Sequence, residues 1–204
     1  MSQLLFSKNN MKKKTLQEEV EEIKQKMNIV SEEKKNHKYE YGCAMLFFSL
    51  PQMNELHKII DSNDLYTEED GFGFETEPHV TLLFGLHPEV TTEEVANVMN
   101  KFQYGDCVLY NASLFKNPLY DVLKFDVRYP TRGGAFLHKA NAELSKFPHT
   151  TNYPDYHPHC TIAYLKPGMG DKYVKELAGH EYTVVPEYGV YSEPNGNQNR
   201  IKIN

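Results

Sequence analysis

The sequence of 204 residues contains no tryptophan, only three cysteines and no long apolar run. None of its apolar stretches approaches the ~20 residues that a helix needs to cross a bilayer. The N-terminus lacks the apolar segment and small-residue cleavage site of a secretory signal. These absences argue against a membrane partner and against secretion, and they indicate a cytoplasmic protein.

The cysteines are too few and too scattered for a disulfide framework or a typical zinc site. Cys43, Cys107 and Cys160 are far apart, and no CxxC pair occurs. His157 and His159 form a His-x-His pair, but no carboxylate cluster accompanies them and Pro158 interrupts a strand register. We therefore predict no metal and no cofactor.

Charge is unevenly distributed along the chain. Residues 1–39 hold nine of the 22 basic residues and six of the 28 acidic residues, which leaves 13 basic and 22 acidic residues, about −9, in residues 40–204. Proteins that track long nucleic acids neutralise many phosphates with basic side chains. An acidic body therefore favours a small substrate over a polymeric nucleic acid.

Residues 1–38 read as a leader that precedes the body of the protein. From Thr15, apolar residues recur at spacings of four and three, and Thr15 and Glu18 occupy capping-box positions, which predicts an amphipathic N-terminal helix. About two heptads are too short for a dimeric coiled coil, so we expect a monomer or a weak homo-oligomer.

The body, residues 39–204, repeats one order of elements: strand, helix, strand, helix, strand. The predicted ranges in the first copy are 39–50, 53–62, 78–86, 92–102 and 106–115. Those in the second copy are 120–129, 134–147, 158–165, 170–178 and 182–191. A last strand at 200–203 is expected to pair back through the turn at 194–196. This order predicts an α+β fold of two pseudo-symmetric lobes, about 39–117 and 118–204, each a mainly antiparallel sheet flanked by helices, with a cleft between them.

The third element of each copy carries the clearest internal match. Pro78-His79-Val80-Thr81-Leu82-Leu83-Phe84 and Pro158-His159-Cys160-Thr161-Ile162-Ala163-Tyr164 share the pattern Pro-His-x-Thr-apolar-apolar-aromatic. Proline begins strands but is rare inside them, so each motif is expected to open its strand. Residues i and i+2 of a strand point to the same side, which places each histidine beside its threonine and turns Val80 and Cys160 inward as apolar fillers.

Two histidines and two threonines converging on one site suit phosphoryl transfer. A neutral imidazole can take a proton from an attacking hydroxyl while a protonated one donates to the leaving oxygen, and each role contributes roughly 10²–10⁴ in rate. Threonine hydroxyls can donate to the phosphate oxygens. A lone His-x-Thr is more often a capped or surface histidine, but the duplicated flanks favour catalysis. Which histidine is the base stays open.

With these motifs the chain resembles the two-histidine (2H, LigT-like) phosphoesterases over about residues 39–204, and His79, Thr81, His159 and Thr161 match that family's motifs. Residues 40–46, 77–86 and 157–159 look most like the phage anti-CBASS branch. That resemblance implies cyclic di- and trinucleotides as substrates, a host-cytoplasmic location, and a late acidic residue that contacts a base, for which Glu187 is the nearest match.

Further substrate contacts are predicted from loop and strand-end positions. Aromatic residues of the two loops before the motif strands either stack bases or cover the core; they include Phe74, Tyr153 and Tyr156, beside Tyr66 and Phe72. Tyr41 lies in a segment that resembles the anti-CBASS branch. Candidate phosphate partners are Lys116, Lys124, Arg128, Lys166 and Arg200.

The leading hypothesis is a metal-independent phosphodiesterase that opens cyclic oligonucleotides by attack of a ribose 2′-hydroxyl. One alternative is an RNA-end enzyme that opens 2′,3′-cyclic phosphates or handles 2′,5′ linkages. Another is a non-catalytic nucleotide-binding module.

Overall fold

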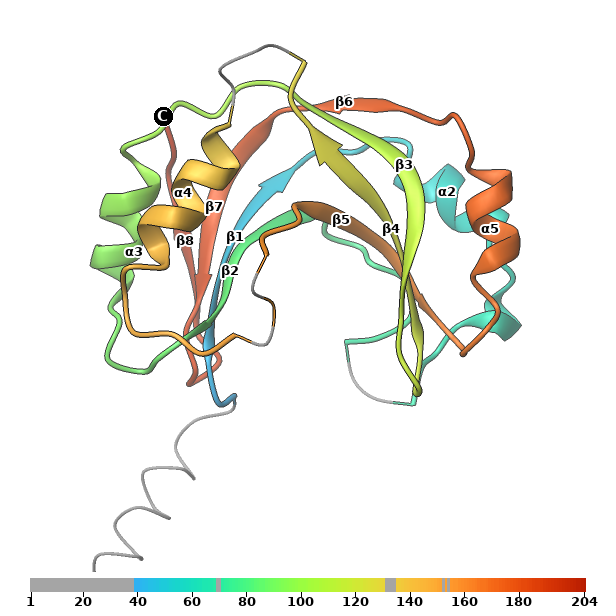
Figure 1. Cartoon of the computed structure of the whole chain (residues 1–204), viewed down its shortest axis with the longest axis horizontal. Helices are drawn as coiled ribbons and strands as arrows, with labels where there is room; N and C mark the ends of the chain where they lie inside the picture. Colours follow the sequence, from blue (N-terminus) through green and yellow to red (C-terminus); the bar gives the residue numbers. More distant parts are fainter. Residues whose placement is uncertain (1–38, 69–70, 131–134, 152, 154) are drawn as a thin grey trace, which may run out of the picture. The chain divides into compact units, whose positions relative to one another are not determined.

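The strands of the body form two antiparallel sheets. The computed structural model describes residues 39–204 apart from 69–70, 131–134, 152 and 154 (Figure 1). The helix expected from Thr15 and the rest of the predicted leader lie outside the described residues. Sheet A has the order β2 (His79–Leu86), β1 (Gly42–Phe48), β7 (Pro186–Ser192), β8 (Gln198–Ile201). Sheet B has the order β5 (His159–Leu165), β4 (Asp121–Arg128), β3 (Cys107–Lys116), β6 (Tyr182–Val184).

Four α-helices and a short 3-10 helix (Ser62–Asp64) accompany the sheets in the described residues. The α-helices are α2 (Met53–Ile59), α3 (Thr92–Met99), α4 (Phe136–Leu144) and α5 (Asp171–Glu176). The start of α3 is fixed by a complete capping box, because the Thr91 hydroxyl accepts from the Glu94 backbone while the Glu94 carboxylate accepts from Thr91. The predicted α+β class, with two antiparallel sheets, is confirmed.

Each sheet combines strands from both halves of the sequence. Sheet A contains β1 and β2 from the first copy and β7 and β8 from the end of the chain, whereas sheet B contains β3 together with β4, β5 and β6. The expected division into contiguous lobes at residue 117 therefore does not match the sheets. The physical reason is that the third strand of each copy pairs with the first strand of the other copy.

The predicted strand at 182–191 is two strands in different sheets. β6 pairs with β3 in sheet B, and β7, beginning at Pro186, pairs with β1 in sheet A. Proline has no backbone N–H to give to a ladder, so it suits a strand start and a change of partner. The predicted last strand, in contrast, is confirmed as β8, which pairs with β7.

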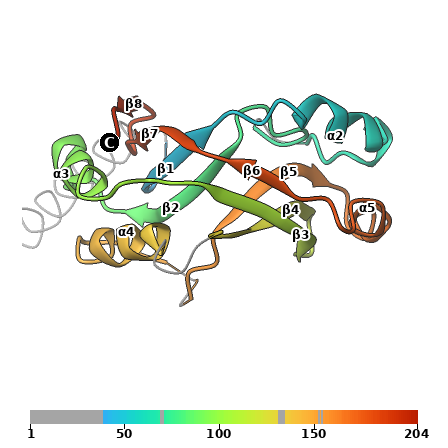
Figure 2. The same ribbon diagram turned by 90° about the horizontal axis from the view of Figure 1, so that it is seen from above.

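Two of the helices pack against the sheet that does not contain their flanking strands. α2, which joins β1 to β2 in sheet A, packs against β5 of sheet B, while α4, which joins β4 to β5, packs against β2 of sheet A. α3 contacts β7 and α5 contacts β3. Seen from above, α3 and α4 lie at one end of the two sheets and α2 and α5 at the other (Figure 2).

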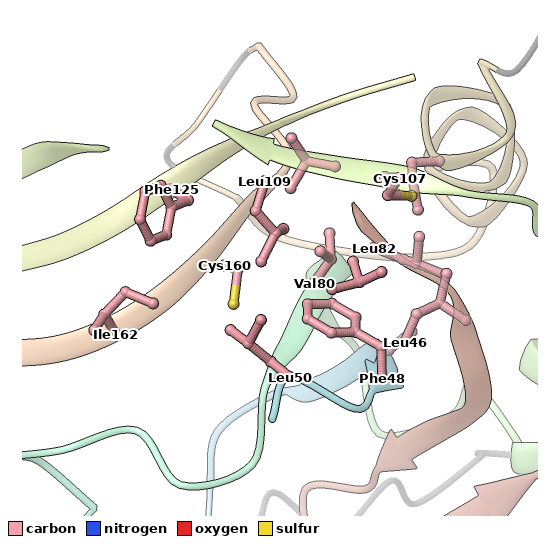
Figure 3. Packing of buried hydrophobic residues seen from close by; sticks show 14 of the residues in the cluster. Leu46, Phe48, Leu50, Val80, Leu82, Cys107, Leu109, Phe125, Cys160 and Ile162 are labelled. Carbon is pink, nitrogen blue, oxygen red and sulfur yellow. The ribbon is translucent and has the colours of Figure 1, made fainter. Parts of the chain in front are cut away.

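One hydrophobic cluster is shared by the two sheets. Leu46 and Val80 of sheet A lie beside Leu109, Phe125 and Cys160 of sheet B (Figure 3). These side chains are almost completely buried. Burial of a side chain of this size contributes about 1.5–3 kcal/mol relative to leaving it exposed. The sheets are therefore joined by a common core as well as by the crossing chain.

The end of β2 is held by the segment that follows α4. Thr150 donates its backbone N–H to the Gly85 carbonyl at 2.9 Å, and His87 donates to the Pro148 carbonyl at 3.0 Å. Gly85 has φ +102°, and a Cβ added there would lie 1.9 Å from the Thr150 carbonyl oxygen. Only glycine fits this close approach of two backbones.

We predict that Gly85→Ala lowers the free energy of unfolding by about 3 kcal/mol or more, because it combines a disfavoured φ with a backbone clash. Gly179→Ala is the matched control, since Gly179 has φ +81° with open space around its Cβ, and should cost only about 1–2 kcal/mol. Urea unfolding of both variants measures the difference. Equal losses would show that the contact with Thr150 is unimportant.

Candidate functional site: the paired His-x-Thr motifs

The two motifs lie on contacting strands. His79 and Thr81 are on β2, and His159 and Thr161 are on β5. Each motif strand is the edge strand of its own sheet, and the two strands pack against each other (Figures 1 and 2). The structure thus places the four residues that the sequence singled out on two contacting strands.

Alternation of burial follows the prediction on β2, whereas on β5 the predicted accessible Thr161 is itself buried, at 8% exposed. Val80 is 2% exposed and Cys160 is fully buried, and both enter the shared cluster (Figure 3). Burial raises the pKa of the Cys160 thiol to about 12, which fits an apolar filler. Both motif strands are also irregular directly after the threonine, because Leu82 and Ile162 have no partner in the ladder. Such bulges re-aim side chains and are frequent at active sites.

Both imidazoles are anchored in the same way. The Nδ1 atom of His79 lies 2.8 Å from the carbonyl oxygen of Glu77, and that of His159 lies 2.8 Å from the carbonyl oxygen of His157. A carbonyl oxygen can only accept, so each Nδ1 carries the hydrogen. Nε2 is therefore the nitrogen that is left to exchange protons with a substrate.

His79 begins a row of stacked planar groups across sheet A. Its ring stacks on Phe47, with centroids 5.1 Å apart, and Phe47 stacks on Tyr188 at 5.3 Å and 7°. The Arg200 guanidinium lies 3.6 Å from the centre of the Tyr188 ring. Glu75 adds a carboxylate oxygen 3.9 Å from Nδ1 of His79. Phe47 is only 7% exposed, so the row supports the His79 ring from sheet A and ends in the positive charge of Arg200.

His159 lies among polar and charged groups of sheet B. Its ring meets the Phe115 ring at 88° with centroids 4.8 Å apart, and the Lys124 ammonium lies 4.4 Å from the centre of the same Phe115 ring. Burial, Lys124 and His79 lower the pKa of His159, while the His157 carbonyl and Asp126 act against them. The net direction is downward, which favours the neutral imidazole.

Two of the predicted substrate contacts have structural roles. Tyr156 donates its hydroxyl to the Thr81 carbonyl at 2.9 Å, and burial raises its pKa well above the usual value. Phe74 stacks on the His57 ring at 4.3 Å and packs against the core. These two rings cover the core and support the motif strands. Of the two interpretations of the loop aromatics, base stacking or covering the core, this placement favours the second.

Tyr41 is not brought to the motifs. It precedes β1 and stacks on His87 at 5.9 Å, six residues from Phe47, which is the partner of His79. At about 3.3 Å per residue this separation is roughly 20 Å. Tyr41 therefore lies apart from the motif histidines, and its role as a substrate contact stays a prediction.

The other two predicted contacts are accessible. Tyr153 is 77% exposed, and Glu187 is exposed on β7 directly before Tyr188. Their roles stay predictions.

The five candidate phosphate partners separate into two groups. Lys116 and Arg128 are paired with Asp171 and Glu181, and Lys166 donates to the Asn63 carbonyl. Lys124 lies over the Phe115 ring, which contacts His159. Arg200 lies over the Tyr188 ring, which stacks on Phe47 and through it on His79.

Phe47, Tyr188, Phe115 and Asp126 were not predicted as site residues. Phe47 is the direct cross-strand partner of His79, and Asp126 is that of His159. The available signal was their place on the first strand of each copy, but pairing register is a long-range property that a single sequence does not reveal.

A cavity of about 310 Å³ lies between the end of β1, α2 and the segment before β2. Its lining includes Phe48, His57 and Pro78 but none of the four motif residues, so we place the chemistry at the motifs on geometry. Within the described part of the chain, no group of three or more His, Cys, Asp or Glu side chains is arranged to hold a metal ion. No helix of that part could span a membrane.

The chain matches no protein-family model and no curated protein sequence. Among solved structures it is similar to Usb1 from Kluyveromyces marxianus, at 10% identity over 80% of this chain and 98% of Usb1, with a TM-score of 0.51. The same Usb1 with uridine monophosphate gives 9% identity over the same shares and a TM-score of 0.51. LigT from E. coli complexed with 3′-AMP is 17% identical over 81% of this chain and 97% of LigT, with a TM-score of 0.46. The likeness to Usb1 confirms the fold that the motif resemblance implies.

The anchoring of both rings predicts a single tautomer. In their neutral forms His79 and His159 should both carry hydrogen on Nδ1, with Nε2 unprotonated. Histidine ¹⁵N shifts, assigned with His79→Ala and His159→Ala, measure this directly. A hydrogen on Nε2 of either neutral ring would contradict the anchoring.

Proposed function

We propose that this protein is a phosphodiesterase that uses His79 and His159 as a general acid–base pair without a metal ion. The observation that carries the proposal is the matched placement of the two motifs. Their strands pack together, and each histidine is anchored through Nδ1 so that Nε2 is free. Two such imidazoles supply both proton transfers that phosphoryl transfer requires.

The reaction is the cleavage of a 3′–5′ phosphodiester by its neighbouring 2′-hydroxyl. One imidazole removes the proton of the 2′-hydroxyl as its oxygen bonds to phosphorus. The bond from phosphorus to the 5′-oxygen breaks, and the second imidazole protonates that oxygen. The products are a 2′,3′-cyclic phosphate and a free 5′-hydroxyl. Thr81 and Thr161 donate hydrogen bonds to the non-bridging oxygens, where charge grows.

Our preferred substrate is a cyclic oligonucleotide second messenger, as cleaved by the phage anti-CBASS branch. The acidic body favours a small ligand over a long nucleic acid. Phe47 is buried in the row between His79 and Tyr188, so the ring offered for base stacking, which contributes about 1–3 kcal/mol per base, is the exposed Tyr153. Arg200 offers a positive charge at the end of that row. The Usb1 neighbour in complex with uridine monophosphate is consistent with a nucleotide ligand.

A substrate panel separates the candidate functions. The protein is incubated in EDTA with cyclic dinucleotides, cyclic trinucleotides and RNA that ends in a 2′,3′-cyclic phosphate, and the products are identified by mass. Linearised cyclic oligonucleotides support the proposal. Turnover of the RNA end alone favours the RNA-end enzyme, and tight binding without turnover favours a nucleotide-binding module.

His79→Ala and His159→Ala should each lower kcat about 10²–10⁴-fold, because each removes one proton transfer. His180→Ala is the matched control, since His180 is exposed and bonded to Tyr182, and should retain activity. Rates are measured with the substrate identified in the panel, with and without EDTA. Loss of wild-type activity in the chelator would refute the mechanism.

Arg200→Met should raise KM about tenfold with little change in kcat, because a charge-assisted contact to a distant phosphate contributes to binding rather than to the chemical step. Lys175→Met removes an exposed positive charge on α5 and serves as the control. Steady-state kinetics at two salt concentrations measure both. A changed kcat with an unchanged KM would place Arg200 outside substrate binding.

A further inference from the structure

An ion pair between a buried lysine and a partly exposed aspartate lies in sheet B next to His159. Lys124 is only 5% exposed, although a lysine side chain is almost never fully buried unless it is paired. Its ammonium donates to the Ser113 hydroxyl at 2.8 Å and to the carboxylate of Asp126. Asp126 is in turn the cross-strand partner of His159, and Lys124 is that of Thr161.

The carboxylate of Asp126 is fixed from a second side. Asn111 donates its side-chain amide to Asp126 at 2.5 Å. Asn111 has φ +51° and lies in the bulge between Tyr110 and Ala112. Positive φ at a residue other than glycine costs free energy and is often found at functional sites. Burial raises the pKa of Asp126, but hydrogen bonds from Lys124 and Asn111 outweigh burial, so the carboxyl stays ionised.

The other motif has no equivalent ion pair. In sheet A the partner of Thr81 is Met45 and the partner of His79 is Phe47. The same positions in sheet B are Lys124 and Asp126. The fold therefore accepts apolar residues at these positions, and a buried ion pair commonly contributes less to stability than an apolar pair. The charges of Lys124 and Asp126 are therefore better explained by a role at the site than by stability of the fold.

We propose that Lys124 is a positioning residue for His159: its ammonium, fixed by Asp126 and Ser113, opposes protonation of the imidazole and so makes His159 the general base and His79 the general acid. This inference rests on the proposed phosphodiesterase function. A positive charge nearby disfavours a second positive charge on the ring. His79 has Glu75 beside it and no lysine at the equivalent position.

The groups that face His159 have opposing effects. Lys124 from β4 and His79 from β2 disfavour its protonation, as burial does, whereas Asp126 from β4 and the His157 carbonyl favour it. Phe115 of β3 contributes an uncharged ring. Removing the lysine and removing the aspartate should therefore move the titration of His159 in opposite directions, which a general loosening of the site would not do.

The test is an NMR titration of the His159 ring in the full-length protein, without substrate, for wild type, Lys124→Met, Asp126→Asn and the double variant. We expect the His159 titration to move to higher pH in Lys124→Met, to lower pH in Asp126→Asn, and to lie between them in the double variant. Lys116→Met, which breaks an exposed ion pair elsewhere on β3, should leave it unchanged.

Kinetics provide the second measurement. In Lys124→Met, kcat/KM should fall about threefold to tenfold on the acidic limb of the pH profile and recover at higher pH, because the base is protonated over a wider range.

Thermal melting of each variant confirms folding, and the double variant leaves no charge unpaired. Shifts of the same sign in both single variants, or none, would overturn the role of Lys124. An inactive wild type would instead overturn the proposed function and leave the titration result standing.

Discussion

The packing of Val80 and Cys160 into one hydrophobic cluster is the contact on which the motif site depends. These residues are the middle positions of the two His-x-Thr motifs, and burying them turns the histidines and threonines to the opposite side of each strand. β2 and β5 are edge strands of different sheets, and the segment before β2 ties them together: Glu75 donates its backbone N–H to the Ile162 carbonyl, and Tyr164 donates to the Gly73 carbonyl. The side chains of the shared core add to these hydrogen bonds.

The exchange of third strands makes that contact difficult to open. β3 follows the first copy but belongs to sheet B, and β7 follows the second copy but belongs to sheet A. Each sheet is thus bound to the other by continuous chain as well as by the core. α2 and α4 add to this, since each packs on the sheet to which its flanking strands do not belong. An acid–base pair benefits from such rigidity, because small errors in position weaken proton transfer.

Local features of the fold could be predicted from the sequence, whereas long-range partners could not. The alternation of buried and accessible residues after His79 is a local property, and so is the capping box of α3, whereas the burial of Thr161 on β5 depends on long-range packing. The strand expected at 182–191 has strand-like residues throughout, but Pro186 separates two segments whose partners lie in different sheets. The distance of Tyr41 from His79 could not be predicted for a related reason: a matching segment does not reveal the register of its strand against the next one.

Symmetry and asymmetry have separate causes in this site. The duplicated order of elements gives two histidines the same backbone anchor and two threonines the same bulge behind them. General acid–base catalysis needs one neutral and one protonated imidazole. Two imidazoles in identical surroundings have no preference for which of them is protonated. In the proposed mechanism, Lys124 and Asp126 beside one motif contribute to that difference, because Met45 and Phe47 at the equivalent positions carry no charge. A duplicated scaffold can therefore hold unlike chemical roles when charge is placed on only one of two equivalent strands.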